Sequence, residues 1–295
     1  MEELDFLKLV RRLVIVALFS DDELMERLVL KGGNLLDLAY GVSTRSSTDV
    51  DLSIDGDFGS LDDLKIRVRK VLSITFGEHG YIVFDVTLTE EPPPRTNDAM
   101  KDFWGGYRIT FKLADEDTFK KYENDPQRLR QRAKSLGQGD SKPFKIDISK
   151  HEYCDDKQSY FVDDVSVYGY SPAMTVAEKL RAICQQMPEY APIIGRKNRG
   201  GALRARDFLD IYMVADKYSV DFDDEEFRQV VRKVFDVKRV PLELIGKIES
   251  TRDFHSHDFA GVEDTVYADV EIKDFDFYFD FVLEKVAALE ALWHK

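Results

Sequence analysis

Two aspartates separated by one residue follow a pair of glycines near the start of the chain. The glycines are Gly32 and Gly33, and the aspartates are Asp49 and Asp51. On an extended strand, residues i and i+2 point to the same side of the backbone, so the two carboxylates would share one face. The apolar residues between and after them would turn into the core. Two carboxylates on one face can hold Mg²⁺, which prefers oxygen ligands and usually bridges to substrate phosphates.

The glycine pair supplies a tight turn before a short helix predicted over Leu35 to Ala39. Asn34 precedes this helix and is a good N-cap residue. Exposed amides at a helix start attract phosphate, helped by the helix dipole. The turn and the aspartates together therefore indicate a site that handles nucleotides with a metal ion.

A third carboxylate would complete a metal triad. Asp147 lies in the run Lys145-Ile146-Asp147-Ile148, whose polar–apolar alternation predicts a strand with Lys145 and Asp147 on one face. A surface residue on an edge strand is the plain alternative. Asp85 also lies on a predicted strand and competes for the same role.

Periodicity predicts an N-terminal α/β domain over residues 1–170, with a mixed sheet flanked by helices, and a mainly helical domain over 171–295. Ser171-Pro172 marks the change, as an N-cap followed by a first-turn proline. The predicted strands are 28–30, 50–54, 81–88, 106–111 and 145–148. The predicted helices are 4–19, 61–72, 175–187, 203–218, 224–235 and 277–293.

Two of these helices carry charged residues that could reach a substrate. Lys179 flanks the apolar stripe of its helix and could enter a cleft between the domains, where a lysine suits a triphosphate. In the next helix, the spacing of Arg204 with Asp207 and of Arg206 with Asp210 first suggests ordinary helix ion pairs.

Composition limits the remaining options. A net charge of −14 argues against a surface that binds nucleic acid everywhere, although the basic stretches 120–134 and 196–206 could contact a phosphate backbone. The apolar run 13–19 is short and lies between acidic residues, so it has neither signal-peptide nor transmembrane form. We therefore expect a cytoplasmic protein with no membrane partner, in which Cys154 and Cys184 are reduced and structural.

The order of these motifs resembles the AbiEii/AbiGii nucleotidyltransferase toxin family, which belongs to the DNA-polymerase-β-like nucleotidyltransferase superfamily. The resemblance covers about residues 25–215 and is weaker over 275–281. Its motifs are Gly32-Gly33, Arg45-x-Ser47-x-Asp49-x-Asp51, the strand with Asp147, Ala177-Glu178-Lys179-Leu180 and Arg206-Asp207-Phe208-x-Asp210. The chain departs from the family in having Gly-Gly where superfamily enzymes often have Gly-Ser, and Asn34 where many relatives have a small hydroxyl residue.

The resemblance implies a polymerase-β-like fold and roles for the site residues. Asp49 and Asp51 would bind Mg²⁺, or Mn²⁺ in its place, with Asp147 as the third ligand or a base. Asp49, Asp51, Lys179 and Asp207 would be catalytic, which replaces the helix-pair interpretation of Asp207. The nucleotide would be bound by Gly32, Gly33, Asn34, Arg45, Ser47, Lys179, Arg204 and Arg206.

The implied reaction is attack by an acceptor on the α-phosphate of a nucleoside triphosphate (NTP), with release of pyrophosphate. As in relatives that are toxins of phage-defence toxin–antitoxin systems, the acceptor would be a tRNA end, translation would stop, and a cognate antitoxin would be a partner. The basic stretches could hold the RNA by its phosphates and shape. Two alternatives stay open: transfer to a protein hydroxyl, and an idle site that binds nucleotide or antitoxin.

Overall fold

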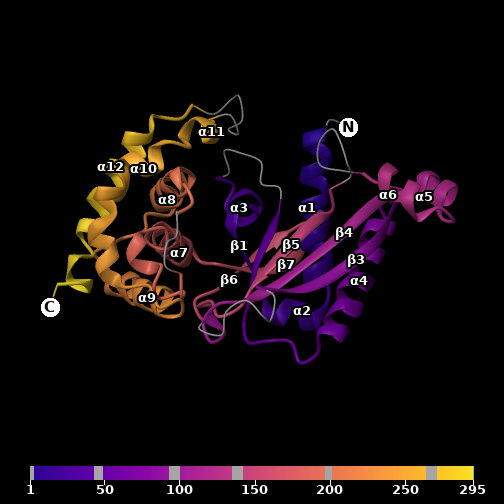
Figure 1. Ribbon diagram of the computed structural model, residues 1–295, viewed down its shortest axis with the longest axis horizontal. Coiled ribbons are helices and arrows are strands. Elements are labelled where there is room, and N and C mark those ends of the chain that lie inside the picture. The colour runs from indigo at the N-terminus through magenta and orange to yellow at the C-terminus, as the bar shows by residue number, and fades with distance from the viewer. Residues whose placement is uncertain are drawn as a thin grey trace.

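The computed structural model describes residues 3–42, 49–92, 100–134, 142–196, 201–263 and 271–294. Within these residues, seven strands form one mixed sheet in the order β3-β4-β5-β2-β1-β7-β6 (Figure 1). The strands are β1 Leu28–Lys31, β2 Val50–Ile54, β3 Tyr81–Glu91, β4 Gly106–Asp115, β5 Phe144–Ser149, β6 Gln158–Val162 and β7 Val165–Gly169.

The prediction of a mixed sheet with flanking helices is confirmed, and β1 to β5 overlap the five predicted strands. The hairpin of β6 and β7 was not predicted. Its turn is Asp163-Asp164, with φ of 48° and 64°, a left-handed conformation typical of two-residue hairpin turns. β-Branched and aromatic residues on both sides of an Asp-Asp pair were the signal that could have revealed it.

The central strand β2 runs antiparallel to β1 and parallel to β5. This arrangement aligns Asp51 with Lys31 on one side and with Asp147 on the other. The burial of β5 alternates, with the apolar residues Ile146 and Ile148 inside and Asp147 only partly covered. Sheet register therefore brings together Asp51 and Asp147, whose positions in the sequence differ by 96 (147 − 51).

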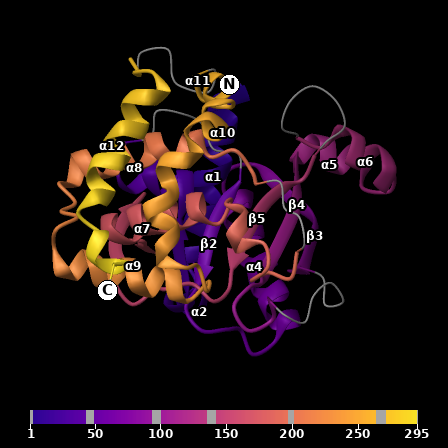
Figure 2. The same ribbon diagram turned by 60° about the vertical axis from the view of Figure 1, so that its left-hand side comes forward.

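Of the helices before residue 170, α1 and α4 pack against each other and against the sheet, whereas α5 and α6 project beyond one end of it (Figures 1 and 2). Side-chain caps fix several helix starts; Ser60, for example, accepts a hydrogen bond from the Asp63 amide at the start of α4. These helices are α1 Glu3–Phe19, α2 Asp22–Arg27, α3 Gly32–Asn34, α4 Leu61–Gly77, α5 Glu116–Tyr122 and α6 Pro126–Arg132, and a π-helical turn Leu35–Ala39 follows α3.

All the described regular elements after residue 170 are helical. Ser171 caps α7 by accepting from the Met174 amide at 3.3 Å, and Pro172 is the first helical residue, as predicted. The helices are α7 Pro172–Cys184, α8 Ala205–Tyr218, α9 Glu225–Asp236, α10 Arg252–Ser256, α11 Phe259–Glu263 and α12 Phe275–Ala287, with a 3₁₀ segment Leu242–Thr251 before α10. We call residues 3–169 the sheet segment and residues 172–294 the helical segment.

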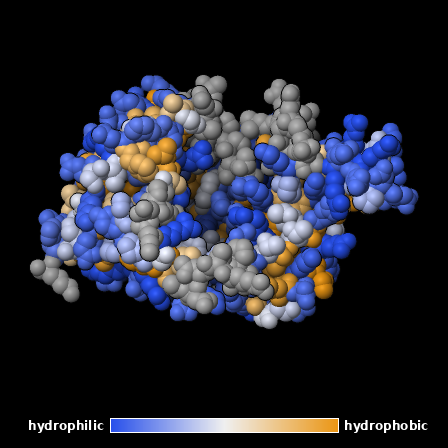
Figure 3. Space-filling view, in the orientation of Figure 1, coloured by the Kyte–Doolittle hydropathy of each residue, from blue (hydrophilic) through white to orange (hydrophobic). Residues whose placement is uncertain are grey.

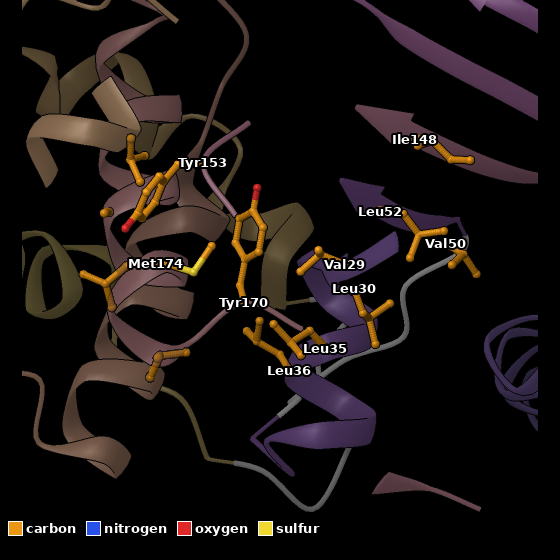
Figure 4. Close-up of a cluster of buried hydrophobic side chains, with 14 of the residues drawn as sticks. Val29, Leu30, Leu35, Leu36, Val50, Leu52, Ile148, Tyr153, Tyr170 and Met174 are labelled. Atoms are coloured by element: carbon orange, nitrogen blue, oxygen red, sulfur yellow. The ribbon is translucent and has the colours of Figure 1, made fainter. Parts of the chain in front are cut away.

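The two segments share buried contacts. One cluster of buried apolar side chains runs from the sheet residues Leu30 and Leu52 to Met174 on α7 (Figure 4). Tyr170 lies between them, and its hydroxyl pairs with Ser53 of β2 at 2.7 Å. The sheet is thereby fixed relative to α7, which carries Lys179. The division into domains at residue 170 stays a prediction.

Cys154 and Cys184 are both buried and not in a disulfide, consistent with the structural role predicted for them. Among the described helices, none combines the length and the apolar character needed to cross a membrane.

Candidate active site

A cavity of about 740 Å³ lies between the sheet segment and the helical segment. In Figure 3 it is the recess near the middle of the molecule, with hydrophilic side chains around it. Its described lining includes eight Lys or Arg side chains and six Asp or Glu side chains, so the cavity is cationic overall in a chain whose net charge is −14. Such a local excess of positive charge favours an anionic ligand.

Asp51 and Asp147 both line this cavity, from the adjacent strands β2 and β5. The pKa of Asp51 is raised to about 6, mainly by burial and also by the negative charges of Asp147, Glu178 and Asp49, while Lys31 opposes the rise. Asp49 directly precedes β2 and acts on Asp51 electrostatically, but it is not part of the described lining.

The glycine turn lies directly against Asp51. Gly32 has a φ of +66°, and a Cβ built on it would lie 2.8 Å from Asp51 Oδ2. Any other residue there would strain the backbone and displace the carboxylate. Gly33 also lines the cavity, so both glycines lie where a phosphate contact was predicted.

The prediction that Asn34 caps a following helix is wrong. The helical turn begins at Gly32, with Asn34 as its last residue. The Asn34 side chain is fully buried, and its amide donates a hydrogen bond to the Asp49 carbonyl oxygen at 2.7 Å. Because burial removes this side chain from the cavity, Asn34 acts in this structure by positioning the backbone before β2.

The sheet order places Asp147, and not Asp85, beside Asp51 of β2. Asp85 is on β3, with β4 and β5 between it and β2, and it is bound by Arg130 through contacts of 2.5 and 3.1 Å. Asp147 is aligned with Asp51 instead. Arg108 of β4, which the sequence did not single out, contacts Asp147 at 2.8 and 3.4 Å.

In the described part of the chain, no three His, Cys, Asp or Glu side chains are grouped closely enough to hold a metal ion. The predicted ligands Asp49, Asp51 and Asp147 are therefore not assembled as a triad here. Their chemistry nevertheless fits Mg²⁺, because all three supply carboxylate oxygens and the negative charges of Asp147 and Asp49 act on the buried Asp51. A divalent cation would neutralise that charge.

Lys179 lies in an ionic cluster that joins α7 to α8. Its ammonium donates hydrogen bonds to Asp207 Oδ1 at 3.0 Å and to Asp210 Oδ2 at 2.7 Å, and all three side chains are buried. Despite burial, the two carboxylates keep the pKa of Lys179 above its usual value. We call these three residues the acid-rich cluster. Arg204 Nη1 also lies 3.6 Å from Asp207 Oδ2, so the helix ion pair predicted there is present.

A second buried cluster, in which three cations surround one carboxylate, was not predicted from the sequence. The Glu152 carboxylate lies 3.6 Å from Lys31 Nζ, 2.7 Å from Arg181 Nη1 and 3.3 Å from Lys238 Nζ. These cations hold the pKa of Glu152 well below its usual range, against the effect of burial. Burial and the neighbouring cations lower the pKa of Lys238 to about 8. We call these four residues the cation-rich cluster; all of them line the cavity.

The beginning of α8 is held by residues from a distant part of the chain. His255 Nδ1 accepts a hydrogen bond from the Arg204 amide at 3.1 Å, and Asp258 Oδ1 accepts one from the Ala205 amide at 3.2 Å. His255 is fully buried beside Phe208, and this burial lowers its pKa to about 4. The two acceptors fix the turn that carries Arg204, Arg206 and Asp207 into the cavity.

The two basic stretches differ in position. In residues 196–206, Arg196, Arg204 and Arg206 line the cavity, as the predicted phosphate contacts require. Residues 120–134 form α5 and α6 at the opposite end of the sheet from the helical segment (Figures 1 and 2). Several of their cations pair with acidic residues, such as Lys134 with Asp115 at 3.1 Å. Arg45, Ser47 and 197–200 lie outside the described residues.

Comparison with known proteins shows which protein family the sequence matches. The family described as "Nucleotidyl transferase AbiEii toxin, Type IV TA system" matches residues 14–281. No curated protein matches the chain. Among solved structures, "Crystal structure of JHP933 from Helicobacter pylori" is similar at 15% identity, with a TM-score of 0.48, over 100% of this chain and 99% of that one.

Proposed function

Because this chain belongs to the AbiEii nucleotidyl transferase toxin family of type IV toxin–antitoxin systems, we propose that it transfers nucleotides from an NTP to the acceptor end of tRNA and thereby inhibits translation. The observation that carries this proposal is the alignment of Asp51 with Asp147 beside Gly32, in a cavity whose opposite wall is the arginine-bearing start of α8. Carboxylates facing cations suit a metal-dependent phosphate reaction.

In the proposed reaction, a hydroxyl oxygen of the acceptor forms a bond to the α-phosphorus, and the bond between that phosphorus and the bridging oxygen breaks. Pyrophosphate leaves with the electron pair, and the hydroxyl proton passes to a base. Bound Mg²⁺, or Mn²⁺, would neutralise phosphate charge and lower the pKa of the hydroxyl. Asp49, Asp51 and Asp147 would hold the metal ion.

The other residues would position the substrates. The amides of Gly32 and Gly33 would approach the triphosphate, with Arg204 and Arg206 as its cationic contacts. Lys179 is already neutralised by two carboxylates, so its first role would be to hold Asp207 in place between α7 and α8. Correct placement of two reactants contributes a large part of the rate of such reactions.

The direct test incubates total tRNA with each α-labelled NTP separately and Mg²⁺. We expect labelled tRNA with the wild type, and a loss of at least about 100-fold with Asp51→Asn, because removing a preorganised charge at a reacting phosphate has effects of this size. Asp55→Asn is a matched control, because Asp55 directly follows β2, is exposed and pairs with Lys157 at 2.7 Å. It should retain activity.

Labelling of protein without tRNA would contradict the tRNA acceptor and favour transfer to a protein hydroxyl. Absence of any labelling, with growth inhibition unchanged in Asp51→Asn, would contradict the transferase proposal and favour action by binding alone. As a member of a toxin–antitoxin family, the protein should also have an antitoxin partner, and co-expression of that partner should restore translation.

A further inference from the structure

Two aromatic side chains line the described part of the central cavity, Trp104 and Tyr107. Tyr107 is almost fully buried, and its hydroxyl donates to Asp57 Oδ1 at 2.5 Å. The Lys150 ammonium also lies 5.2 Å from the centre of the Tyr107 ring. Because the hydroxyl and the ring of Tyr107 already contact neighbouring side chains, Trp104 provides the partly exposed aromatic surface of the cavity.

Trp104 lies where the central cavity meets a smaller one of about 220 Å³. Pro92, Met100 and Gly106 line both cavities with it, so the boundary is mainly apolar. A Cβ on Gly106 would lie 2.1 Å from the Ile148 carbonyl oxygen, so β4 can pass this close to β5 only with glycine at this position. The smaller cavity is too small for a whole nucleoside triphosphate. Its lining combines the Trp104 ring with polar side chains such as Lys101 and His151, so it offers a heterocyclic base both an apolar surface and hydrogen-bonding groups.

Positive charge lies immediately beside the Trp104 ring. Lys238 Nζ is 5.1 Å from the ring centre, and the same ammonium belongs to the cation-rich cluster around Glu152. Arg181 of this cluster approaches the same Glu152 carboxylate. A planar aromatic surface and a group of cations are therefore adjacent, which is the combination that a nucleotide requires: stacking for its base and charge for its phosphates.

We propose that Trp104 stacks against a nucleobase that enters the smaller cavity, with the phosphates of the same nucleotide toward the cation-rich cluster. The inference rests on the proposed nucleotidyl transfer and extends it to the recognition of the base. The base belongs either to the incoming NTP or to the terminal nucleotide of the acceptor; both present the same aromatic chemistry. Stacking would make Trp104 a specificity-determining residue of the reaction.

The chain offers a direct optical test, because it contains two tryptophans, Trp104 and Trp293. Trp293 is near the C-terminus and packs beside Gly246, outside the cavity. In the Trp293→Phe protein, titration with each NTP or with a short RNA ending in the tRNA acceptor sequence should quench the remaining tryptophan fluorescence. Inorganic tripolyphosphate, which has the charge but no base, should not. This binding measurement needs no turnover, so it can succeed or fail independently of the transferase assay.

Kinetics separate the two sources of the base. Trp104→Leu should raise KM by about 5- to 150-fold, the equivalent of ~1–3 kcal/mol of lost stacking per base. Trp104→Phe should recover most of this loss. A higher KM for the NTP alone assigns the base to the incoming nucleotide, and a higher KM for tRNA alone assigns it to the acceptor. The proposal is overturned if tripolyphosphate quenches as strongly as NTP, if neither NTP nor RNA quenches, or if Trp104→Leu lowers kcat while both KM values stay unchanged.

Discussion

The acid-rich and cation-rich clusters both border the central cavity but differ in composition. In the first, two carboxylates surround Lys179, and in the second, three cations surround Glu152. With Arg204 beside Asp207 and Glu178 beside Arg181, the charges of the first cluster balance, whereas the second keeps one positive charge in excess. A buried excess charge is costly unless a ligand or a protonation change compensates it. The comparison indicates that the acid-rich cluster is a structural contact between α7 and α8, whereas the cation-rich cluster is suited to an anion.

The largest expected effect comes from removing the central acid of the cation-rich cluster. Glu152→Gln should lower the free energy of unfolding by about 3–5 kcal/mol at pH 7, because it removes the carboxylate that three buried cations share. Urea denaturation measures this loss. Pyrophosphate should restore more stability to the variant than to the wild type. Glu189→Gln is the control: Glu189 is exposed and pairs with Lys247 at 2.8 Å, so its loss should cost less than about 1 kcal/mol.

Removing the central cation of the acid-rich cluster should have a similar or slightly smaller effect on stability. Lys179→Met should destabilise the protein by about 2–4 kcal/mol at pH 7, because Asp207 and Asp210 lose the buried ammonium that binds both of them. Chemical denaturation at pH 7 measures this loss. A loss below about 1 kcal/mol, as for an exposed ion pair, would contradict the assignment of the cluster as a buried structural contact.

Lys238 gives a smaller effect, visible in alkaline solution. Its pKa is lowered from 10.5 to about 8 in the folded protein, so between these pH values the unfolded chain binds more protons than the folded one. The free energy of unfolding should therefore rise from pH 8 to pH 10.5, by at most about 3 kcal/mol at 1.36 kcal/mol per pKa unit. In Lys238→Met this rise should be absent. A rise that persists in the variant would assign the proton to another group.

The smallest effect should come from His255, which holds the start of α8 and with it the acid-rich cluster. His255→Leu leaves the partly buried Arg204 amide without its acceptor, which should cost about 1–3 kcal/mol, and His255→Asn should recover part of this. In the wild type, the pKa of His255 falls from 6.5 to about 4 on folding. Its contribution is therefore complete above pH 6.5 and is lost as pH falls from 6.5 to 4. Thermal unfolding between pH 4 and 8 tests both statements; equal melting temperatures for Leu and Asn variants would exclude this positioning role.

Local pattern was sufficient for the strands that carry the aspartates and for the main helices. The alternation around Asp147 predicted its strand because burial of every second residue is a property of the local sequence. The Ser171-Pro172 start of α7 was predicted for the same reason, since a cap involves neighbouring residues only. The wrong role of Asn34 arose where a distant contact, the Asp49 carbonyl, competed with local capping.

The sequence by itself determined the order and types of the candidate site residues, and through them the family and its transferase chemistry. Only the tertiary structure decided which of these residues meet. Strand order placed Asp147, and not Asp85, beside Asp51. The packing of distant elements assembled the cation-rich cluster from Lys31, Glu152, Arg181 and Lys238. The reason is physical: periodicity reports which face of an element is buried, whereas the partners of a buried charge depend on how strands and helices distant in the chain pack together.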